Sequence, residues 1–299
     1  MKPHALKKGD KIGIIAPASP VLNFEKLNKS VKLLESYGYK VVLGKSCSLK
    51  YGFLAGEDDV RAKDLNDFFS MKDVKAIFCL RGGYGSIRIL DKIDFDIIKK
   101  NPKIFVGYSD ITALLNIFFD KLKLVVFHGP MIGTGELLDE FNFNSLFNCL
   151  TGRFTDSRID LKPINKGDAQ GIIVGGNLSV LHSIMGTKYT IDLKDKILFI
   201  EEINEEPYKI DRMLYTLKYM GVFDKLKGVI LGQFTGCDSK DKGFDLEHVL
   251  HKFFSSVKVP VYYGLQVGHA ERKITIPIGV KTRIFNNQLI FLEEGVIND

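Results

Sequence analysis

A serine follows a short apolar run at a point where the chain changes from strand to helix periodicity. The apolar run 104–106 ends at Gly107, Ser109 follows, and apolar residues then recur at helical spacing as far as Phe119. A serine on such a turn can be exposed with helix N–H groups behind it, as a nucleophile requires. Ordinary turn chemistry also favours Gly and Ser here, and Ile111 occupies the place of the second glycine of a G-x-S-x-G motif. Ser109 is therefore a candidate nucleophile, and a plain turn is the alternative.

A serine nucleophile needs a base, and two histidines lie where a side chain could reach a pocket. His128 ends an apolar run, whereas His269 lies in a glycine-bearing loop between strands. Position alone does not choose between them. His248 and His251 are three residues apart and do not form an HExxH motif, so no metal site is expected there.

Acidic residues follow the apolar run 197–200 directly. A carboxylate at the end of a buried strand is costly unless it has a partner, so Glu201 is either hydrogen-bonded or functional. Glu202 should point to the opposite face and be solvated. A solvated loop that caps the next helix is the alternative for the whole run 201–206.

A glycine-rich loop at residues 81–86 offers backbone N–H groups that no side chains obstruct. It would fit an oxyanion hole or a phosphate cradle, but Arg88 stands where a dinucleotide fingerprint needs its third glycine. Arg81 could bind a substrate carboxylate or form a structural salt bridge.

These residues need elements to position them, and the pattern predicts two domains. Strands and helices alternate through residues 1–150, and the strands read as continuous apolar runs, which indicates a parallel α/β sheet covered on both faces. Loops that leave the carboxyl ends of such strands build the site. The polar stretch 151–168 is predicted to be a linker. Residues 169–299 are predicted to form a smaller, β-rich α+β domain with a hairpin that turns at Asn286-Asn287.

The composition is that of an ordinary globular protein, with 299 residues of which 45% are hydrophobic. The net charge of +6 is spread along the chain without a basic arm, so nucleic acid is not an expected partner. Four scattered cysteines fit reduced thiols in a cytoplasm and make a metal site unlikely to form. No export signal or membrane span is apparent, and we expect a cytoplasmic protein.

Six sequence blocks in one order carry a resemblance to a known family. They are Arg-Gly-Gly-Tyr-Gly at 81–85, Gly-Tyr-Ser-Asp-Ile-Thr at 107–112, His-Gly-Pro-Met at 128–131, Gly-Gly-Asn-Leu at 175–178, Leu-Phe-Ile-Glu-Glu at 198–202 and Gly-His-Ala-Glu-Arg at 268–272. Together they resemble the LD-carboxypeptidase family of serine peptidases, which includes muramoyltetrapeptide carboxypeptidase and the microcin C self-immunity proteins.

The resemblance implies roles for particular residues. Ser109 would be the nucleophile, Glu201 the acid and His269 the base. It also implies oxyanion donors among the backbone amides of Asp110 and of the loop at Gly82 and Gly83. Arg81 and Asn177 are expected to contact the substrate. The fold it implies is a class I glutamine-amidotransferase-like N-terminal domain with a small β-rich C-terminal domain, commonly as a homodimer, without a cofactor or a metal.

The activity that the resemblance implies is hydrolysis of the L,D-peptide bond that releases terminal D-alanine from a murein tetrapeptide during cytoplasmic peptidoglycan recycling. A microcin-type hydrolase of aminoacyl or peptidyl nucleotide analogues is the nearest alternative. It would need a surface for base stacking, and the chain has no Trp, so it ranks second. A non-catalytic binding protein on the same fold is a further alternative, which the presence of all three triad residue types argues against.

Overall fold

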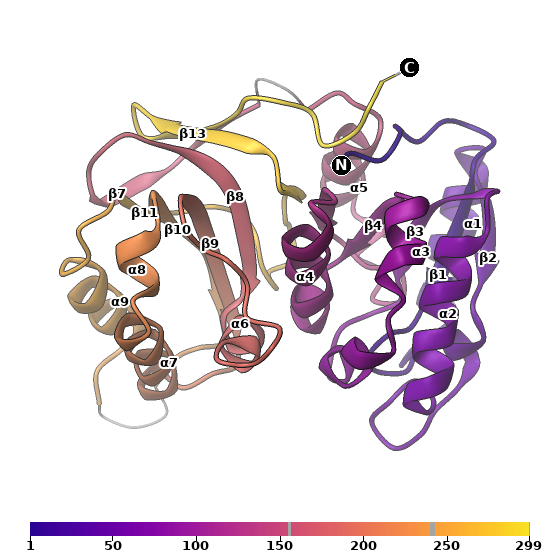
Figure 1. Cartoon of the computed structure of the whole chain (residues 1–299), viewed down its shortest axis with the longest axis horizontal. Coiled ribbons are helices and arrows are strands. Elements are labelled where there is room, and N and C mark those ends of the chain that lie inside the picture. The colour runs from indigo at the N-terminus through magenta and orange to yellow at the C-terminus, as the bar shows by residue number, and fades with distance from the viewer. Residues whose placement is uncertain (155–156, 240–242, 299) are drawn as a thin grey trace. The chain divides into compact units, whose positions relative to one another are not determined.

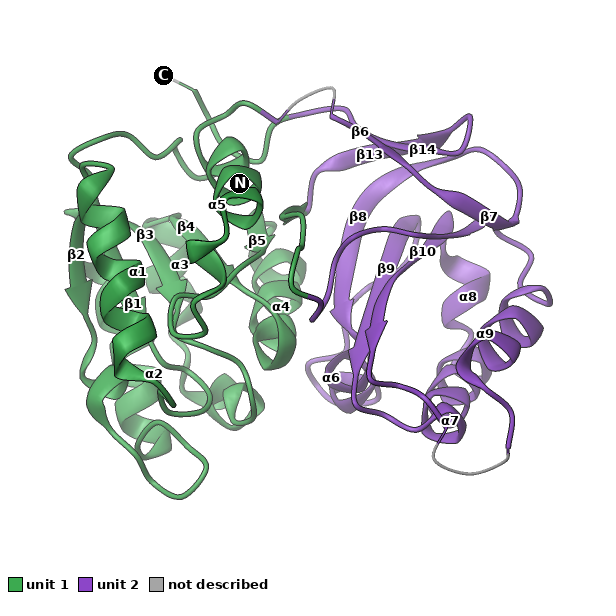
Figure 2. Cartoon of the chain, turned by 180° about the vertical axis from the view of Figure 1, so that it is seen from behind, with its two compact units in different colours: residues 1–153, 271–278, 294–299 green, residues 154–270, 279–293 purple. Residues whose placement is uncertain are grey.

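The computed structural model describes residues 1–154, 157–239 and 243–298. Two compact units make up the chain, as Figure 2 shows. Unit 1 contains residues 1–153, 271–278 and 294–299, and unit 2 contains residues 154–270 and 279–293. The chain therefore enters unit 2 twice and returns to unit 1 each time.

Unit 1 is built on a six-stranded sheet in the order β12-β5-β4-β3-β1-β2. Figure 1 labels its strands β1, β2, β3 and β4. Its strands are β1 (Lys11–Ile15), β2 (Lys40–Leu43), β3 (Val74–Cys79), β4 (Ile104–Gly107), β5 (Val126–His128) and β12 (Ile276–Ile278). The first five are parallel, and β12 runs antiparallel to β5. This sheet confirms the parallel α/β fold that the alternating pattern predicts.

Helices cover this sheet because its strands are apolar on both faces. The α-helices of unit 1 are α1 (Phe24–Ser36), α2 (Asp58–Ser70), α3 (Phe95–Lys100), α4 (Thr112–Leu122) and α5 (Glu140–Leu150). An aromatic cluster of Phe69, Phe105 and Phe118 joins α2, β4 and α4, with ring centroids 5.1–6.0 Å apart. The strand and the helix on either side of Ser109 are thus packed into the core of unit 1.

Unit 2 contains an eight-stranded mixed sheet in the order β6-β14-β13-β8-β9-β10-β11-β7. Its strands are β6 (Arg158–Asp160), β7 (Lys162–Asn165), β8 (Ala169–Asn177), β9 (Lys196–Ile203), β10 (Gly228–Thr235), β11 (Val261–Tyr263), β13 (Lys281–Phe285) and β14 (Gln288–Phe291). Its α-helices are α6 (Leu178–Ile184), α7 (Pro207–Tyr219), α8 (Val222–Lys225) and α9 (Leu246–Phe254). Strands β8 to β11 are parallel, and the antiparallel β13–β14 hairpin turns at Asn286 and Asn287, as predicted.

The two units divide the chain differently from the sequence-based boundaries. The segment 151–168, expected as a linker, contains β6 and β7, which pair with β14 and β11 of unit 2. Residues 155–156 of that segment lie outside the described residues. Segments 271–278 and 294–299, expected in the C-terminal domain, belong to unit 1. The physical reason is strand pairing, because β12 covers the edge that β5 would otherwise expose.

Among the helices in the described part of the chain, none combines the length and the apolarity that crossing a bilayer requires.

Candidate active site

Ser109 sits at a strained turn between β4 and α4. The strand is fully buried, Tyr108 is extended, and Ser109 has φ +62° at the start of a 3₁₀ turn that leads into α4. This left-handed conformation costs a non-glycine residue about 1–2 kcal/mol. Gly107 allows the turn to be this tight, because a Cβ there would lie 2.8 Å from the Ile111 side chain. Ser109 therefore occupies the type of strained turn on which nucleophiles are found.

The glycine-rich loop after β3 lies against this serine. A Cβ added to Gly82 would come within 2.7 Å of Ser109 Cβ and 3.2 Å of Asp110 N. Backbone at Gly82 therefore reaches Ser109 only because no side chain intervenes. Ser19 fastens the loop, since its N–H donates to Gly82 O at 3.3 Å and its Oγ accepts from Tyr84 N at 3.1 Å. The predicted oxyanion donors and the predicted nucleophile are thus adjacent within unit 1.

Asp110 anchors the other side of the nucleophile turn. Its carboxylate accepts a hydrogen bond from Ser86 N at 2.8 Å, and Ser86 Oγ donates to Asp110 O at 2.5 Å. Burial raises the pKa of the Asp110 carboxyl above its usual value, and the hydrogen bonds from Ser86 act against this shift. The Asp110 side chain therefore holds the loop at Ser86. The predicted catalytic contribution of Asp110 comes from its backbone N–H group.

His269 and Glu201 form a hydrogen-bonded pair in unit 2. His269 Nδ1 lies 2.8 Å from Glu201 Oε2, and the Glu201 side chain is fully buried at the end of β9. Burial raises the pKa of the Glu201 carboxyl, whereas the hydrogen bond and the charge of His269 lower it. With Nδ1 engaged by the carboxylate, proton transfer at this ring would use Nε2. The pair has the geometry of a base held in one tautomer by an acid.

The loop that carries His269 is fastened to β10. Gln233 N donates to Val267 O at 2.8 Å, and Ala270 N donates to Gln233 Oε1 at 3.1 Å. Gly268 has φ +139°, and a Cβ there would lie 3.0 Å from Gln233 Cβ and 3.2 Å from Glu201 Cβ. Glycine is favoured because residues with a side chain rarely adopt this backbone conformation and because a Cβ here would be tightly packed against its neighbours.

Glu202 differs from the sequence-based expectation of a solvated side chain. It is only 2% exposed, accepts from Asn177 Nδ2 at 2.8 Å and from Ser179 N at 2.8 Å, and also binds Ser179 Oγ. Asn177 caps α6 by accepting from Val180 N at 3.2 Å. The start of α6 thus compensates the buried charge of Glu202, which makes Glu202 a structural carboxylate and Glu201 the one that faces a histidine.

The remaining candidates occupy different surroundings. Arg81 is partly exposed, and its Nη1 donates to Pro20 O at 3.4 Å. His128 is buried, with its ring centroid 5.6 Å from that of Tyr108. Of the two histidines that position alone left equal, His269 is the one hydrogen-bonded to a carboxylate in the described structure.

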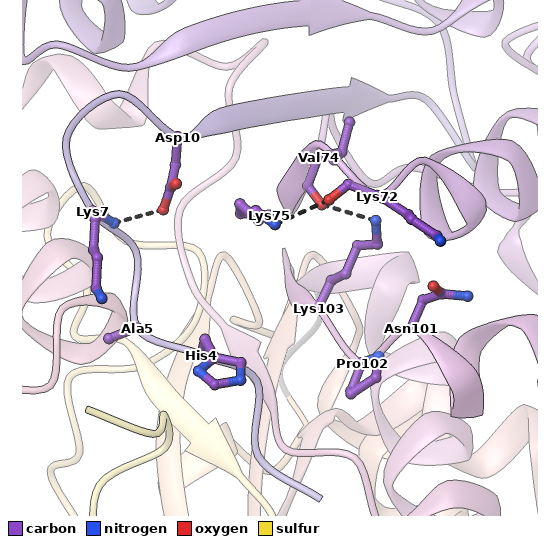
Figure 3. Close-up of a pocket in the computed structure, with 10 residues that line it drawn as sticks. All are labelled: His4, Ala5, Lys7, Asp10, Lys72, Val74, Lys75, Asn101, Pro102 and Lys103. Carbon is purple, nitrogen blue, oxygen red and sulfur yellow. Dashed lines mark hydrogen bonds between the residues drawn. The ribbon is translucent and has the colours of Figure 1, made fainter. Parts of the chain in front are cut away.

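A cavity of about 520 Å³ lies in unit 1 near the amino ends of β3 and β4 (Figure 3). Four lysines line it together with His4 and Asp10: Lys7, Lys72, Lys75 and Lys103. Two of these ammonium groups already bind main-chain carbonyls, Lys75 that of Lys72 at 3.0 Å and Lys103 that of Val74 at 2.8 Å. Ser109 and Gly82 follow the opposite, carboxyl ends of β4 and β3, so this cavity is separate from the nucleophile turn.

Within the described ranges, no group of three or more His, Cys, Asp and Glu side chains is arranged to hold a metal ion.

Comparison with known proteins adds family evidence to this geometry. The model for the LD-carboxypeptidase N-terminal domain matches residues 12–129, and that for the LD-carboxypeptidase C-terminal domain matches residues 170–284. The "Probable murein peptide carboxypeptidase" of Bacillus subtilis is 43% identical, with 94% of this chain and 90% of the relative covered.

Two solved structures share the fold. A muramoyltetrapeptide carboxypeptidase from Oxalobacter formigenes superposes with a TM-score of 0.83 at 31% identity, covering 94% of this chain and 97% of that one. The microcin C7 self-immunity protein MccF in complex with aspartyl sulfamoyl adenosine superposes with a TM-score of 0.92 at 26% identity, covering 99% and 100%. On these matches, the chain belongs to the LD-carboxypeptidase family.

Proposed function

We propose that this protein is a serine LD-carboxypeptidase that releases terminal D-alanine from murein tetrapeptides. The observation that carries the proposal is the hydrogen bond of 2.8 Å between His269 Nδ1 and the buried Glu201 carboxylate. A histidine held in this way can act as a general base. Ser109 on its strained turn is the proposed nucleophile, whose hydroxyl proton this base would remove. The murein substrate is supported by the names of the Bacillus and Oxalobacter relatives.

The mechanism follows from the side chains. His269 Nε2 takes the proton of Ser109 as Oγ attacks the carbonyl carbon of the L,D-peptide bond. Glu201 keeps the imidazole in the required tautomer and stabilises its protonated form. Backbone N–H groups of Asp110 and of the Gly82-Gly83 loop stabilise the oxyanion. Collapse transfers the proton to the leaving amine of D-alanine, and water then hydrolyses the acyl-enzyme.

Arg81 is the proposed partner of the terminal carboxylate of the substrate, because its guanidinium is partly exposed beside Gly82 and has no carboxylate partner among the contacts of the described residues. Asn177 remains a predicted substrate contact, although its amide group already binds Glu202 and caps α6. We further expect a homodimer in the cytoplasm, as the family resemblance implies.

The first prediction tests the nucleophile. Ser109→Ala should abolish D-alanine release from an L,D-linked tetrapeptide, measured by mass spectrometry, while circular dichroism shows an intact fold. Ser36→Ala, which removes an exposed hydroxyl at the end of α1, is the matched control and should keep full activity. Full activity in Ser109→Ala would sink the mechanism.

The same assay addresses the second candidate function. The TM-score of 0.92 to a microcin immunity protein favours an aminoacyl nucleotide analogue as the alternative substrate. Incubation with aspartyl sulfamoyl adenosine beside the tetrapeptide separates the two. We expect cleavage of the tetrapeptide, and cleavage of the nucleotide analogue alone would reverse the ranking.

A further inference from the structure

Lys273 is a buried lysine of unit 1 whose ammonium group lies beside the residue that precedes Ser109. It is 2% exposed, and its Nζ lies 2.8 Å from Glu136 Oε1 and 3.4 Å from the Tyr108 hydroxyl. The same Nζ lies 4.8 Å from the centre of the Tyr108 ring, at cation–π distance. The Tyr108 hydroxyl also donates to Glu136. These three side chains, Lys273, Glu136 and Tyr108, form a closed cluster, called the lysine cluster below.

The cluster is fixed to the surrounding backbone. The second carboxylate oxygen of Glu136 accepts from Met131 N at 3.1 Å, just after β5. Asn142 on α5 accepts from Lys273 N at 2.8 Å and donates to Glu271 O at 2.9 Å. Both charged members of the cluster are therefore held in place, so that Tyr108 packs against a rigid support.

Such a support matters because the nucleophile turn is strained. A non-glycine residue at φ +62° keeps this conformation only when its neighbours fix the chain around it. Asp110 is fixed on one side by its two hydrogen bonds with Ser86. Tyr108 is fixed on the other side by the lysine cluster. Ser109 is thus clamped through both of its neighbours in the sequence.

Lys273 is also connected to the proposed base through the chain. It lies four residues after His269, and four residues span at most about 14 Å when fully extended. The segment that contains it is anchored in unit 1 by Thr275 N, which donates to Ser145 Oγ at 2.8 Å, and by the pairing of β12 with β5. Lys273 therefore contacts Tyr108 through its side chain, and its backbone N–H is held by Asn142 four residues after His269.

We propose that Lys273 is a positioning residue that couples Ser109 to His269. The proposal rests on the proposed function, because it takes Ser109 as the nucleophile and His269 as the base. Lys273 touches neither substrate nor reacting atoms in this mechanism. It acts through Tyr108, which holds the Ser109 turn, and through the short chain to His269.

The test separates positioning from plain stability. Replacing both members of a buried ion pair by uncharged residues of similar shape often leaves stability unchanged, whereas removal of one partner strands a buried charge. We therefore compare Lys273→Met, Glu136→Gln and the double variant. If the pair aims the reacting groups, the double variant regains thermal stability but its kcat stays about 10- to 100-fold below wild type, with KM within about twofold.

Lys103→Met is the matched control. Lys103 is also buried in unit 1, at 5% exposure, and its ammonium binds the main-chain carbonyls of Met71 and Val74. Lys103 and Val74 line the cavity of Figure 3. Its kcat per folded molecule should equal that of wild type. Tyr108→Phe serves as a milder variant, since it leaves the ion pair in place and removes only the hydroxyl.

A second measurement does not depend on activity. Hydrogen exchange of the peptide 107–115 should be faster in the double variant and in Tyr108→Phe than in wild type, because the strained turn loses its support. Wild-type kcat together with wild-type exchange in the double variant would overturn the proposal, and if that variant does not fold, the same result in Tyr108→Phe would do so. Retained activity in Ser109→Ala would instead reject the proposed function, and the exchange result would still decide whether the cluster supports the turn.

Discussion

At the scale of single residues, the proposed mechanism requires Glu201 to be ionised in a place where burial penalises its charge. Its side chain is fully buried, and burial raises the pKa of its carboxyl despite the hydrogen bond to His269. In the proposed mechanism an ionised Glu201 stabilises a protonated His269, but the same charge costs folding free energy when the histidine is neutral. The proposed catalytic role and the stability of the fold therefore make opposite demands on the ionisation of Glu201.

The pH dependence of stability should reveal this conflict. Because the pKa of Glu201 is higher in the folded than in the unfolded protein, the folded state binds more protons between the two values, and stability falls as pH rises through that interval. Glu201→Gln does not titrate there. Its Tm relative to wild type should therefore increase from about pH 4 to about pH 7, while D-alanine release is lost.

Glu202→Gln is the control for this measurement. Its carboxylate accepts from Asn177 and Ser179, so an amide at this position would turn one N–H group toward a donor and lower stability at neutral pH. A Tm difference for Glu201→Gln that shrinks as pH rises would contradict the argument.

The sequence predicts some of these residues and not others, because some depend on contacts between near neighbours in the chain and others on contacts between distant residues. The Ser109 turn depends on Gly107 and Ile111, its near neighbours in the chain, so a local pattern predicts it. The burial of Glu202 depends on hydrogen bonds from Asn177 and Ser179. These two residues lie more than twenty positions earlier, at the junction of β8 and α6. The role of Lys273 could not be predicted either, because its ion-pair partner Glu136 is far away in the sequence.

At the scale of elements, β10 and the loop 267–270 form one support for His269, the proposed base. Gly232 contributes to it, since a Cβ there would lie 2.6 Å from Val267 O and 3.3 Å from Glu201 Cβ. Strand β9, strand β10 and the loop can approach this closely only where glycines replace side chains.

Two glycines of unit 2 allow a matched comparison of this support. Gly268→Ala and Gly264→Ala both place a side chain at positive φ, +139° and +97°, but only Gly268 has neighbours within 4 Å of the new Cβ. We expect both variants to lose about 1 kcal/mol or more of stability, with a loss of kcat in Gly268→Ala alone. Equal kcat values for the two variants, measured by D-alanine release, would show that the loop tolerates displacement.

The elements themselves could largely be predicted, but their pairing could not. The strand and helix around Ser109 and the Asn286-Asn287 hairpin follow from local periodicity and turn chemistry. Residues 274–278 read equally well as a strand of either domain, because their alternation says nothing about which edge they join. The partner, β5, lies some 150 residues earlier, and no local signal encodes that choice.

At the scale of the whole molecule, neither unit is a continuous stretch of chain. Unit 1 needs β12 to cover β5, and its N-terminal segment pairs with the C-terminal one through Ala5 N and Ile297 O at 2.8 Å. Unit 2 needs the hairpin β13–β14, which pairs with β8 and β6. Each unit is therefore completed by short segments that follow residue 270 in the sequence.

A fragment should fail for this reason. Residues 1–153 expressed alone would expose the edge of β5 and leave Glu136 without the ammonium of Lys273. We expect the fragment to aggregate or to unfold without a sharp transition in size-exclusion chromatography and thermal denaturation, with the full chain as the reference. A monomeric fragment with cooperative unfolding would show that β12 is dispensable.

Because β12 follows β5 by many residues in the chain, its position also determines when the sheet of unit 1 can be completed during synthesis. A ribosome adds about 5–20 residues per second, so the edge of β5, completed at residue 128, waits roughly 8–30 s for its partner strand at residues 276–278. Throughout that interval the sheet of unit 1 has an open edge and Tyr108 has no Lys273 beside it. A nascent chain therefore contains Ser109 throughout this interval before the strand and the lysine that support its turn have been synthesised.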